Sequence, residues 1–332
     1  MAQMKYFYEL TISSSPHAHS PVTTQTIMRD VLIALVPALL GSIYFFGFRS
    51  LLVTLVSAAA CVFFEWGFCK IRKLHCKTYD LSAVVTGVLL AFVCPVTIPY
   101  WTIILGDFFA IVLVKMLFGG LGKNIVNPAL AGRAFLFSWP VLMSNWVRVG
   151  FDNAAGLLST ADAVTAATPM SAMHQGALPE ESILDMFLGN IGGCIGETSA
   201  LLLIIGCAYL LYRKVITARI PLAYIGTVAI LAFLFPQGND RIAWMAAQVF
   251  GGGLMLGAIF MATDYVTSPL TKLGQIVYGI GCGVITILIR YFGGYSEGVT
   301  YAILCMNACA VLLDKIGRPV KFGAPKKEAA KK

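Results

Sequence analysis

Ten apolar runs of 15 to 26 residues follow one another along this chain of 332 residues, and none contains more than two charged residues. A helix needs about 20 apolar residues to cross a bilayer, whereas a strand of a membrane barrel needs about ten in an alternating pattern. Only 12% of the residues are charged, against about 25% in a soluble domain. The chain is therefore predicted to be an all-α polytopic membrane protein, and its net charge of +8 does not indicate a nucleic-acid-binding face.

Several runs are shorter than a full span, and the third and fourth are separated only by residues 96–99. Irregular backbone at this depth is tolerated only where it is buried in protein or lines a cavity. We therefore expect about ten transmembrane helices, some of them broken. The candidate spans are Val31–Phe48, Ser50–Phe68, Leu81–Pro95, Tyr100–Phe118, Asn127–Met143, Phe187–Tyr212, Ile220–Phe235, Ile242–Thr263, Gly274–Phe292 and Gly298–Leu313.

The distribution of lysine and arginine predicts the orientation of these spans. With the N-terminus in the cytoplasm, 19 of the 24 basic residues fall on the inner side and five on the outer side, as the positive-inside rule expects. Residues 1–29 are polar and lack the apolar core of a cleaved signal peptide. The predicted organisation is a cytoplasmic segment (1–29), a first transmembrane repeat (30–143), an extracytoplasmic loop (144–186), a second repeat (187–314) and a basic cytoplasmic tail (315–332).

The two halves resemble each other. The segment from Gly87 to Pro99 aligns without gaps with the segment from Gly257 to Pro269, and both contain Val-Thr-x-Pro. Two halves of five spans each must run in opposite directions through the membrane. Such inverted repeats place binding sites at discontinuous helices near the midplane.

The outer loop contains the most informative motif, Asp-Ala-Val-Thr-Ala-Ala-Thr-Pro, which runs from Asp162 to Pro169. Its last threonine, Thr168, is flanked by small residues and is biased toward an extended backbone by the proline that follows it. Taken alone, the motif is also typical of a helix start, because threonine and aspartate are good capping residues.

The motif resembles the flavin-attachment pattern Asp-x-x-Ser/Thr-x-Ala-Thr of the RnfD/NqrB family, with Asp162, Thr165 and Thr168 at the fixed positions. Ala163 and Ala166 stand where relatives often have glycine, and both are small. The resemblance extends from about Ser13 to Asp314. It is carried also by Ser15–His17, Lys115–Ala129, Gly196–Ser199 and Met261–Pro269.

The resemblance implies a membrane subunit of an ion-pumping redox complex. It implies that a flavin transferase esterifies Thr168 with the phosphate of FMN, and that relatives also hold a non-covalent riboflavin, for which no residue here indicates a site. It implies the other Rnf subunits (A, B, C, E and G) and membrane lipid as partners, in a bacterial or archaeal cytoplasmic membrane. The complex would move electrons between ferredoxin and NAD and pump Na⁺ or H⁺, and this chain alone would not be active.

Charged residues within apolar runs are costly and usually serve a function. The acids Glu65, Asp107, Glu197 and Asp264 lie within or at the edges of the spans. Because Na⁺ prefers oxygen ligands, the hydroxyls of Thr97 and Thr267 near the breaks join these acids as candidates for an ion path. Capping and subunit contacts are the alternative roles. The sequence signals neither a metal site nor a catalytic triad, and the cysteines are expected to be reduced.

Two other functions stay open. One is a transporter or channel of inverted-repeat architecture without a redox role, which would need no flavin-accepting threonine. The other is an NqrB-type subunit of a quinone-reducing Na⁺ pump, which the missing N-terminal extension argues against.

Overall fold

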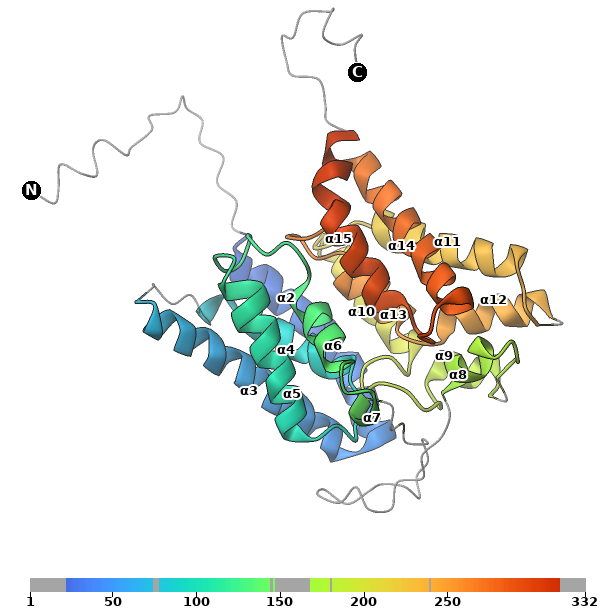
Figure 1. Cartoon of the computed structure of the whole chain (residues 1–332), viewed down its shortest axis with the longest axis horizontal. Coiled ribbons are helices and arrows are strands. Elements are labelled where there is room, and N and C mark those ends of the chain that lie inside the picture. The colour runs from blue at the N-terminus through green and yellow to red at the C-terminus, as the bar shows by residue number, and fades with distance from the viewer. Residues whose placement is uncertain are drawn as a thin grey trace, which may run out of the picture.

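The computed structural model describes residues 22–73, 78–143, 146, 168–179, 181–238 and 240–316. Every regular element within those ranges is a helix, which confirms the predicted all-α class. Two groups of helices lie side by side: the blue-to-green elements of the first half and the yellow-to-red elements of the second (Figure 1). Asp162 and Thr165 of the predicted attachment motif lie outside the described residues.

The first half begins with two long helices. Thr23 caps the first of them, because its hydroxyl accepts from the Thr26 backbone N–H at 3.2 Å. Gly47, with φ of 77°, turns the chain into the second, a conformation that a residue with a Cβ atom rarely adopts. The elements of this half are α2 (Thr24–Phe46), α3 (Phe48–Ile71), η1 (Thr78–Asp80), α4 (Ser82–Phe92), α5 (Tyr100–Phe108), the π-helical η2 (Phe109–Met116), α6 (Pro128–Leu136) and α7 (Pro140–Met143).

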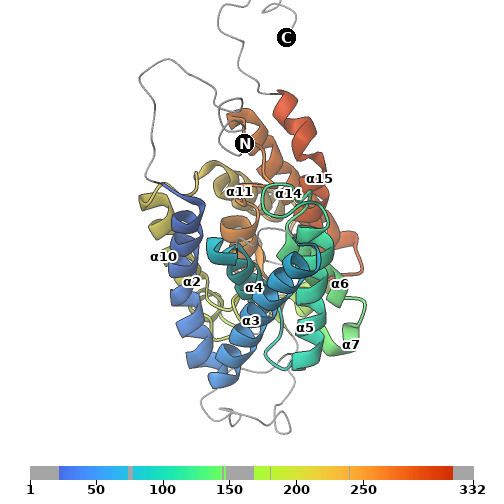
Figure 2. The same ribbon diagram turned by 90° about the vertical axis from the view of Figure 1, so that its left-hand side faces the viewer.

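The second half is built around α14, which packs against both α11 and α15. The halves meet where α10 packs against α2 (Figure 2). The described elements of this half are α8 (Pro169–His174), α9 (Ile183–Leu188), α10 (Ala200–Tyr212), α11 (Arg219–Leu234), α12 (Arg241–Phe250), α13 (Leu254–Leu256), the π-helical η4 (Gly257–Met261), α14 (Lys272–Phe292) and α15 (Val299–Ile316).

Few of the helices are long enough to cross a bilayer without interruption. Among the described residues, α2, α3 and α14 meet the length and hydropathy expected of a span. A fourth span results if α12 and the helical stretch Leu254–Met261 are counted together across their bend of 59°. The other candidate runs form shorter helices, such as the 11 residues of α4. The runs therefore predict helices correctly but overstate their uninterrupted length.

Two breaks in the helices are held by buried arginines. Between α4 and α5, the Arg49 side chain donates to the carbonyls of Val96 at 2.8 Å and Ile98 at 3.3 Å. Between α12 and α13, the Arg290 side chain donates to the carbonyls of Gln248, Gly251 and Gly252 at 2.6 to 3.3 Å. Backbone carbonyls without a helical partner must be satisfied inside the protein at membrane depth. The two arginines donate hydrogen bonds to these carbonyls, so they are not merely charges on the outer surface.

The glycine-rich segment after η2 forms a turn, as its sequence predicts. Gly119, Gly120 and Gly122 have φ of 111°, 86° and 91°, values that favour glycine. Beyond this turn Asn127 caps α6 by accepting from the Ala129 backbone N–H at 3.0 Å. The amide of the same side chain donates to the Met261 carbonyl at 3.2 Å, at the end of η4, and so ties the two halves together.

Candidate functional site

Thr168 stands at the N-terminal end of α8 and is 8% exposed. Its backbone is extended and Pro169 occupies the first helical position, which is the position that proline favours in a helix. The Thr168 side chain makes no capping hydrogen bond. Instead Ser171 donates to the Thr168 carbonyl from both its backbone N–H and its hydroxyl, at 2.9 and 2.7 Å. The Thr168 hydroxyl is therefore not used to start the helix.

Thr168 lines a small pocket with an open volume of about 290 Å³. The pocket is formed by segments that are far apart in the sequence: the start of α8, residues 191–198, Gly252 and Glu297. Gly252 has a φ of 52°, and an added Cβ atom there would collide with Met170. The close packing at this wall of the pocket therefore requires glycine. The resemblance-bearing residues Glu197 and Thr198 thus share one pocket with Thr168.

An ionic cluster forms one wall of this pocket. The Arg133 side chain of α6 donates to Glu197 at 3.3 Å and to Glu297 at 2.5 Å. It also donates to the Thr300 hydroxyl at 3.2 Å and to the Cys194 sulfur at 3.4 Å. Arg133 belongs to the first half and its four partners to residues 194–300, so the cluster joins the two halves of the chain.

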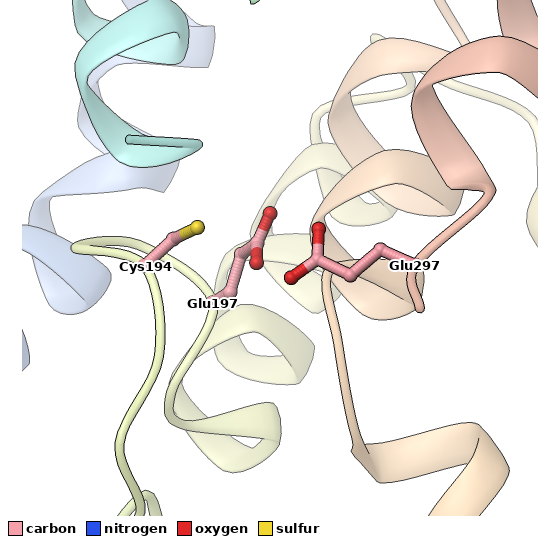
Figure 3. Close-up of side chains that lie close together, drawn as sticks. All are labelled: Cys194, Glu197 and Glu297. Atoms are coloured by element: carbon pink, nitrogen blue, oxygen red, sulfur yellow. The ribbon is translucent and has the colours of Figure 1, made fainter. Parts of the chain in front are cut away.

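The cluster has one positive and two negative side chains. Cys194 and Glu197 come from one loop and Glu297 reaches toward them from the opposite side (Figure 3), and their potential ligand atoms lie within 4.8 Å of one another. Such a set could bind a metal ion. However, the Arg133 guanidinium bonds both carboxylates and occupies the place that a cation would take. The geometry therefore favours an ion-pair cluster over a metal centre.

A second set of charged groups lies inside the first half. Lys115 of η2 donates to Glu65 of α3 at 3.0 Å and to the Ser82 hydroxyl at 2.7 Å. Both members of the ion pair are buried. Asp107 of α5 lies against an earlier part of α3, where its carboxylate contacts the Ser57 hydroxyl at 2.7 Å and the Cys61 sulfur at 3.2 Å.

Asp264 and Thr267 lie together in the irregular segment between η4 and α14, where the Thr267 hydroxyl donates to Asp264 at 3.1 Å. Asp264 also lines a pocket of about 740 Å³ between the two halves, and Lys115 and Asn124 line the same pocket. The Asn124 side-chain oxygen is buried there without a protein partner among the described residues. Thr97 lies in the other irregular segment, where Arg49 reaches its carbonyl at 3.5 Å.

Comparisons with known proteins identify the family of the chain. The model of the NQR2, RnfD, RnfE family matches residues 11–323. The D subunit of the Na⁺-translocating ferredoxin:NAD⁺ oxidoreductase complex of Acetobacterium woodii is 46% identical over 323 residues, which are 96% of each chain. The D subunit of the proton-translocating complex of Clostridium ljungdahlii is 43% identical over 330 residues, 94% of this chain and 96% of that protein. The D subunit of an ion-translocating oxidoreductase complex of Halorhodospira halophila is 36% identical over 342 residues, covering 93% of this chain and 94% of the relative.

The chain belongs to the NQR2, RnfD, RnfE family. This confirms the resemblance inferred from its motifs. Within this family member, the residues proposed from the sequence for an ion path do not form one continuous line among the described residues. Glu65 and Asp107 lie in the first half, Asp264 and Thr267 line or adjoin the pocket between the halves, and Glu197 belongs to the pocket of Thr168.

Sequence reasoning missed three of the residues that organise these sites: Arg133, Glu297 and Lys115. Arg133 and Lys115 each lie inside an apolar run, yet in the sequence they serve only to indicate orientation and, in the case of Lys115, to carry part of the family resemblance. Intramembrane basic residues are as informative as intramembrane acids, so the signal was available. Glu297 lies in a short loop between two helices, and its sequence surroundings carry no such signal.

Proposed function

We propose that this chain is the membrane-embedded D subunit of an Rnf-type complex and carries FMN as a phosphoester on Thr168. In this proposal it relays electrons within a complex that couples ferredoxin:NAD electron transfer to the translocation of Na⁺ or H⁺. The observation that carries the proposal is the Thr168 hydroxyl, which lines a pocket and takes no part in capping α8. The names of relatives that match nearly the whole chain support this assignment within the complex.

The surroundings of Thr168 suit an attachment point. The pocket beside the Thr168 hydroxyl has an open volume of about 290 Å³, and the hydroxyl is not used to cap the helix. Arg133 offsets one of the two glutamate charges in the pocket wall. When bound, FMN supplies one-electron chemistry, while the protein supplies position and electrostatics.

The proposal includes a second, non-covalent flavin, riboflavin, as the resemblance implies. The pocket of about 740 Å³ between the halves is the candidate for it. Its lining is largely apolar, and the unpaired oxygen of Asn124 offers a hydrogen-bond acceptor there. An apolar lining combined with polar groups that fix the orientation of a ligand is typical of small-molecule sites.

We also propose ten spans in two inverted halves, with both termini in the cytoplasm and the loop 144–186 outside. The corresponding breaks after α4 and after η4 support this topology, since they coincide with the repeated Val-Thr-x-Pro segments. The exposed apolar side chains of α2, α3 and α11 suit contact with lipid and with the other Rnf subunits (A, B, C, E and G). A flavin transferase is the partner required for maturation.

The ion path is proposed at the intramembrane acids and threonines. Asp264 and Thr267 are the first candidates, because they lie at a helix break beside a pocket, where unwound segments of transporters often bind cations. Glu65, Asp107 and Glu197 are further candidates, whereas the Thr97 carbonyl is already engaged by Arg49. The relatives do not fix the ion, since one is named for Na⁺ and another for protons.

The test is flavin fluorescence of the chain in a denaturing gel, after co-expression with a flavin transferase. The wild type should give a fluorescent band and Thr168→Ala should give none. Thr198→Ala is the matched control, because Thr198 lines the same pocket and should leave the band unchanged. A non-fluorescent wild type, with the transferase active on another substrate, would shift the assignment to a transporter without a redox role.

A further inference from the structure

Asp107 is completely buried in α5, and no cation among the described residues neutralises it. The described residues form four ion pairs, and Asp107 takes part in none of them. One of its carboxylate oxygens, Oδ2, is buried without any hydrogen-bond partner there. An ionised carboxylate in such a place is strongly disfavoured, and the group takes up a proton instead.

The hydrogen bonds around Ser57 support the same conclusion independently. The Ser57 hydroxyl lies 2.8 Å from the Gly87 carbonyl and 2.7 Å from Asp107 Oδ1. A hydroxyl has a single proton to donate. If Asp107 were ionised, both neighbours would be acceptors, and the single hydroxyl proton could bond only one of them. If Asp107 is a neutral acid, both short contacts are hydrogen bonds: Asp107 donates to Ser57, and Ser57 donates to Gly87.

Ser82 provides an internal comparison. Its hydroxyl also has two close polar neighbours, Asp80 at 2.6 Å and Lys115 at 2.7 Å. Here the lysine ammonium donates to the hydroxyl, and the hydroxyl donates to the carboxylate. Each of the two hydrogen bonds of the Ser82 hydroxyl thus has a donor and an acceptor, and no additional proton is required. The contrast identifies Asp107 as the position that needs one.

Asp107 has titratable neighbours on several packed elements. Cys61 and Glu65 belong to α3, Cys94 follows α4, and Lys115 lies on η2, which continues directly from α5. On α6, Arg133 is engaged with its two glutamates. Lys115 is likewise engaged with Glu65, so neither cation is available to Asp107.

A line of polar groups leads from Asp107 to the pocket between the halves. Ser57, Cys61 and Glu65 are spaced four residues apart on α3 and therefore share one face of the helix. Cys61 contacts Asp107, and Glu65 lies four residues farther, about 6 Å along the axis. Glu65 in turn contacts Lys115, and Lys115 and Ser82 line the pocket.

We propose that Asp107 is a proton-holding acid, and that its proton exchanges with the pocket through Glu65 and Lys115. The inference rests on the proposed function in one respect: that function gives the proton a role in ion translocation. In one transfer, the Asp107 O–H bond breaks and the proton passes through a bridging water to the Glu65 carboxylate. Asp107 becomes a carboxylate and Glu65 becomes a neutral acid, so the negative charge moves from Glu65 to Asp107. The reverse transfer restores both.

The chemistry of the line favours protons over Na⁺. The Lys115 ammonium lies between Glu65 and Ser82, at the place where a metal cation would have to pass, and it repels one. Hydroxyl, thiol, ammonium and carboxyl groups can each pass on a proton. Asp107 therefore holds a proton, and the route is a half-channel that opens to one pocket.

The test is infrared spectroscopy of the purified full chain at neutral pH, prepared with isotope-labelled aspartate. A protonated carboxyl group has a C=O stretch separate from that of a carboxylate, and the band shifts in heavy water. The wild type should show an acid band that moves with the aspartate label, and Asp107→Asn should remove it. Asp240→Asn, at the exposed cap of α12, is the control that should retain it.

The route is tested by the rate at which this band exchanges in heavy water. Glu65→Gln should retain the band and slow its exchange by about a hundredfold, the lower end of the contribution of a positioned proton-transfer group. A wild type without a labelled acid band would overturn the assignment, and unchanged exchange in Glu65→Gln would overturn the route. The measurement needs no flavin, so its outcome is independent of the fluorescence test on Thr168.

Discussion

Replacing Arg133 with methionine should destabilise the chain more than any single change to its acidic partners. The substitution keeps a long side chain at a position that is 1% exposed, but it leaves the Glu197 and Glu297 carboxylates without their shared cation. Glu197→Gln, in contrast, leaves Arg133 paired with Glu297. The two variants touch the same cluster and differ in the number of uncompensated charges that remain.

The magnitude follows from the distances. At an effective dielectric constant of about 20, a pair at 3.3 Å attracts by about 5 kcal/mol and one at 2.5 Å by about 7 kcal/mol. The two carboxylates lie within 4.8 Å of each other and repel by about 3.5 kcal/mol or more once the arginine is gone. Protonation of one carboxylate and local relaxation reduce these values, so we expect a loss near the 3–5 kcal/mol typical of a broken buried pair.

The assay is the free energy of unfolding in mixed detergent micelles, measured for single and combined variants. Arg133→Met should lose about 3–5 kcal/mol, and adding Glu197→Gln and Glu297→Gln should recover most of that loss. Arg241→Met, at an exposed arginine that begins α12, should lose less than about 0.5 kcal/mol. If Glu197→Gln costs as much as Arg133→Met, or if the combined variant shows no recovery, the electrostatic reasoning is wrong.

Two further predictions concern the backbone. Arg49→Met should increase amide hydrogen exchange in residues 93–99, because the carbonyls held by Arg49 lose their donor. Arg49→Lys should restore part of the protection. Equal exchange in the wild type and both variants would contradict this prediction. Gly87→Ala should destabilise by about 1–3 kcal/mol, since a Cβ atom there would lie 2.7 Å from the Ala58 Cα atom. Gly226 is a helical glycine at which an added Cβ atom would meet nothing within 4 Å. Gly226→Ala should therefore stabilise the chain by up to about 1 kcal/mol. Thermal unfolding should show opposite shifts for Gly87→Ala and Gly226→Ala.

The helical class and the break after α4 could be predicted from the sequence. Apolar runs identify helices reliably because the hydrophobic requirement of the bilayer is strong. The break after α4 follows from Pro95 and Pro99, which interrupt the helix within a few residues of each other. Run length, however, does not reveal a bend such as the 59° between α12 and the stretch Leu254–Met261, because a bent helix is as apolar as a straight one.

The candidate site was only partly predictable. The sequence singled out Thr168 and Glu197 through different motifs, 29 positions apart, and nothing in it indicated that both line one pocket. That proximity depends on the packing of α8 against residues 191–198 and on the Arg133 cluster, which are long-range contacts. Periodicity and composition report local preferences, and long-range ion pairs leave no local pattern.

The buried chemistry of the two halves differs. In the first half, Asp107, Glu65 and Lys115 place titratable groups along α3 and along the α5–η2 helix that faces it. The central helix of the second half, α14, contains no acid. Its buried polar contacts include the hydrogen bonds of tyrosine hydroxyls with Thr286 and Asn307 at 2.6 Å and those of Arg290, which holds the carbonyls of the break before α13. A proton that enters from the pocket between the halves meets Lys115 on the first-half side and Asp264 on the second-half side. The buried Glu65 and Asp107 lie beyond Lys115, which makes the first half the one to probe first for proton exchange.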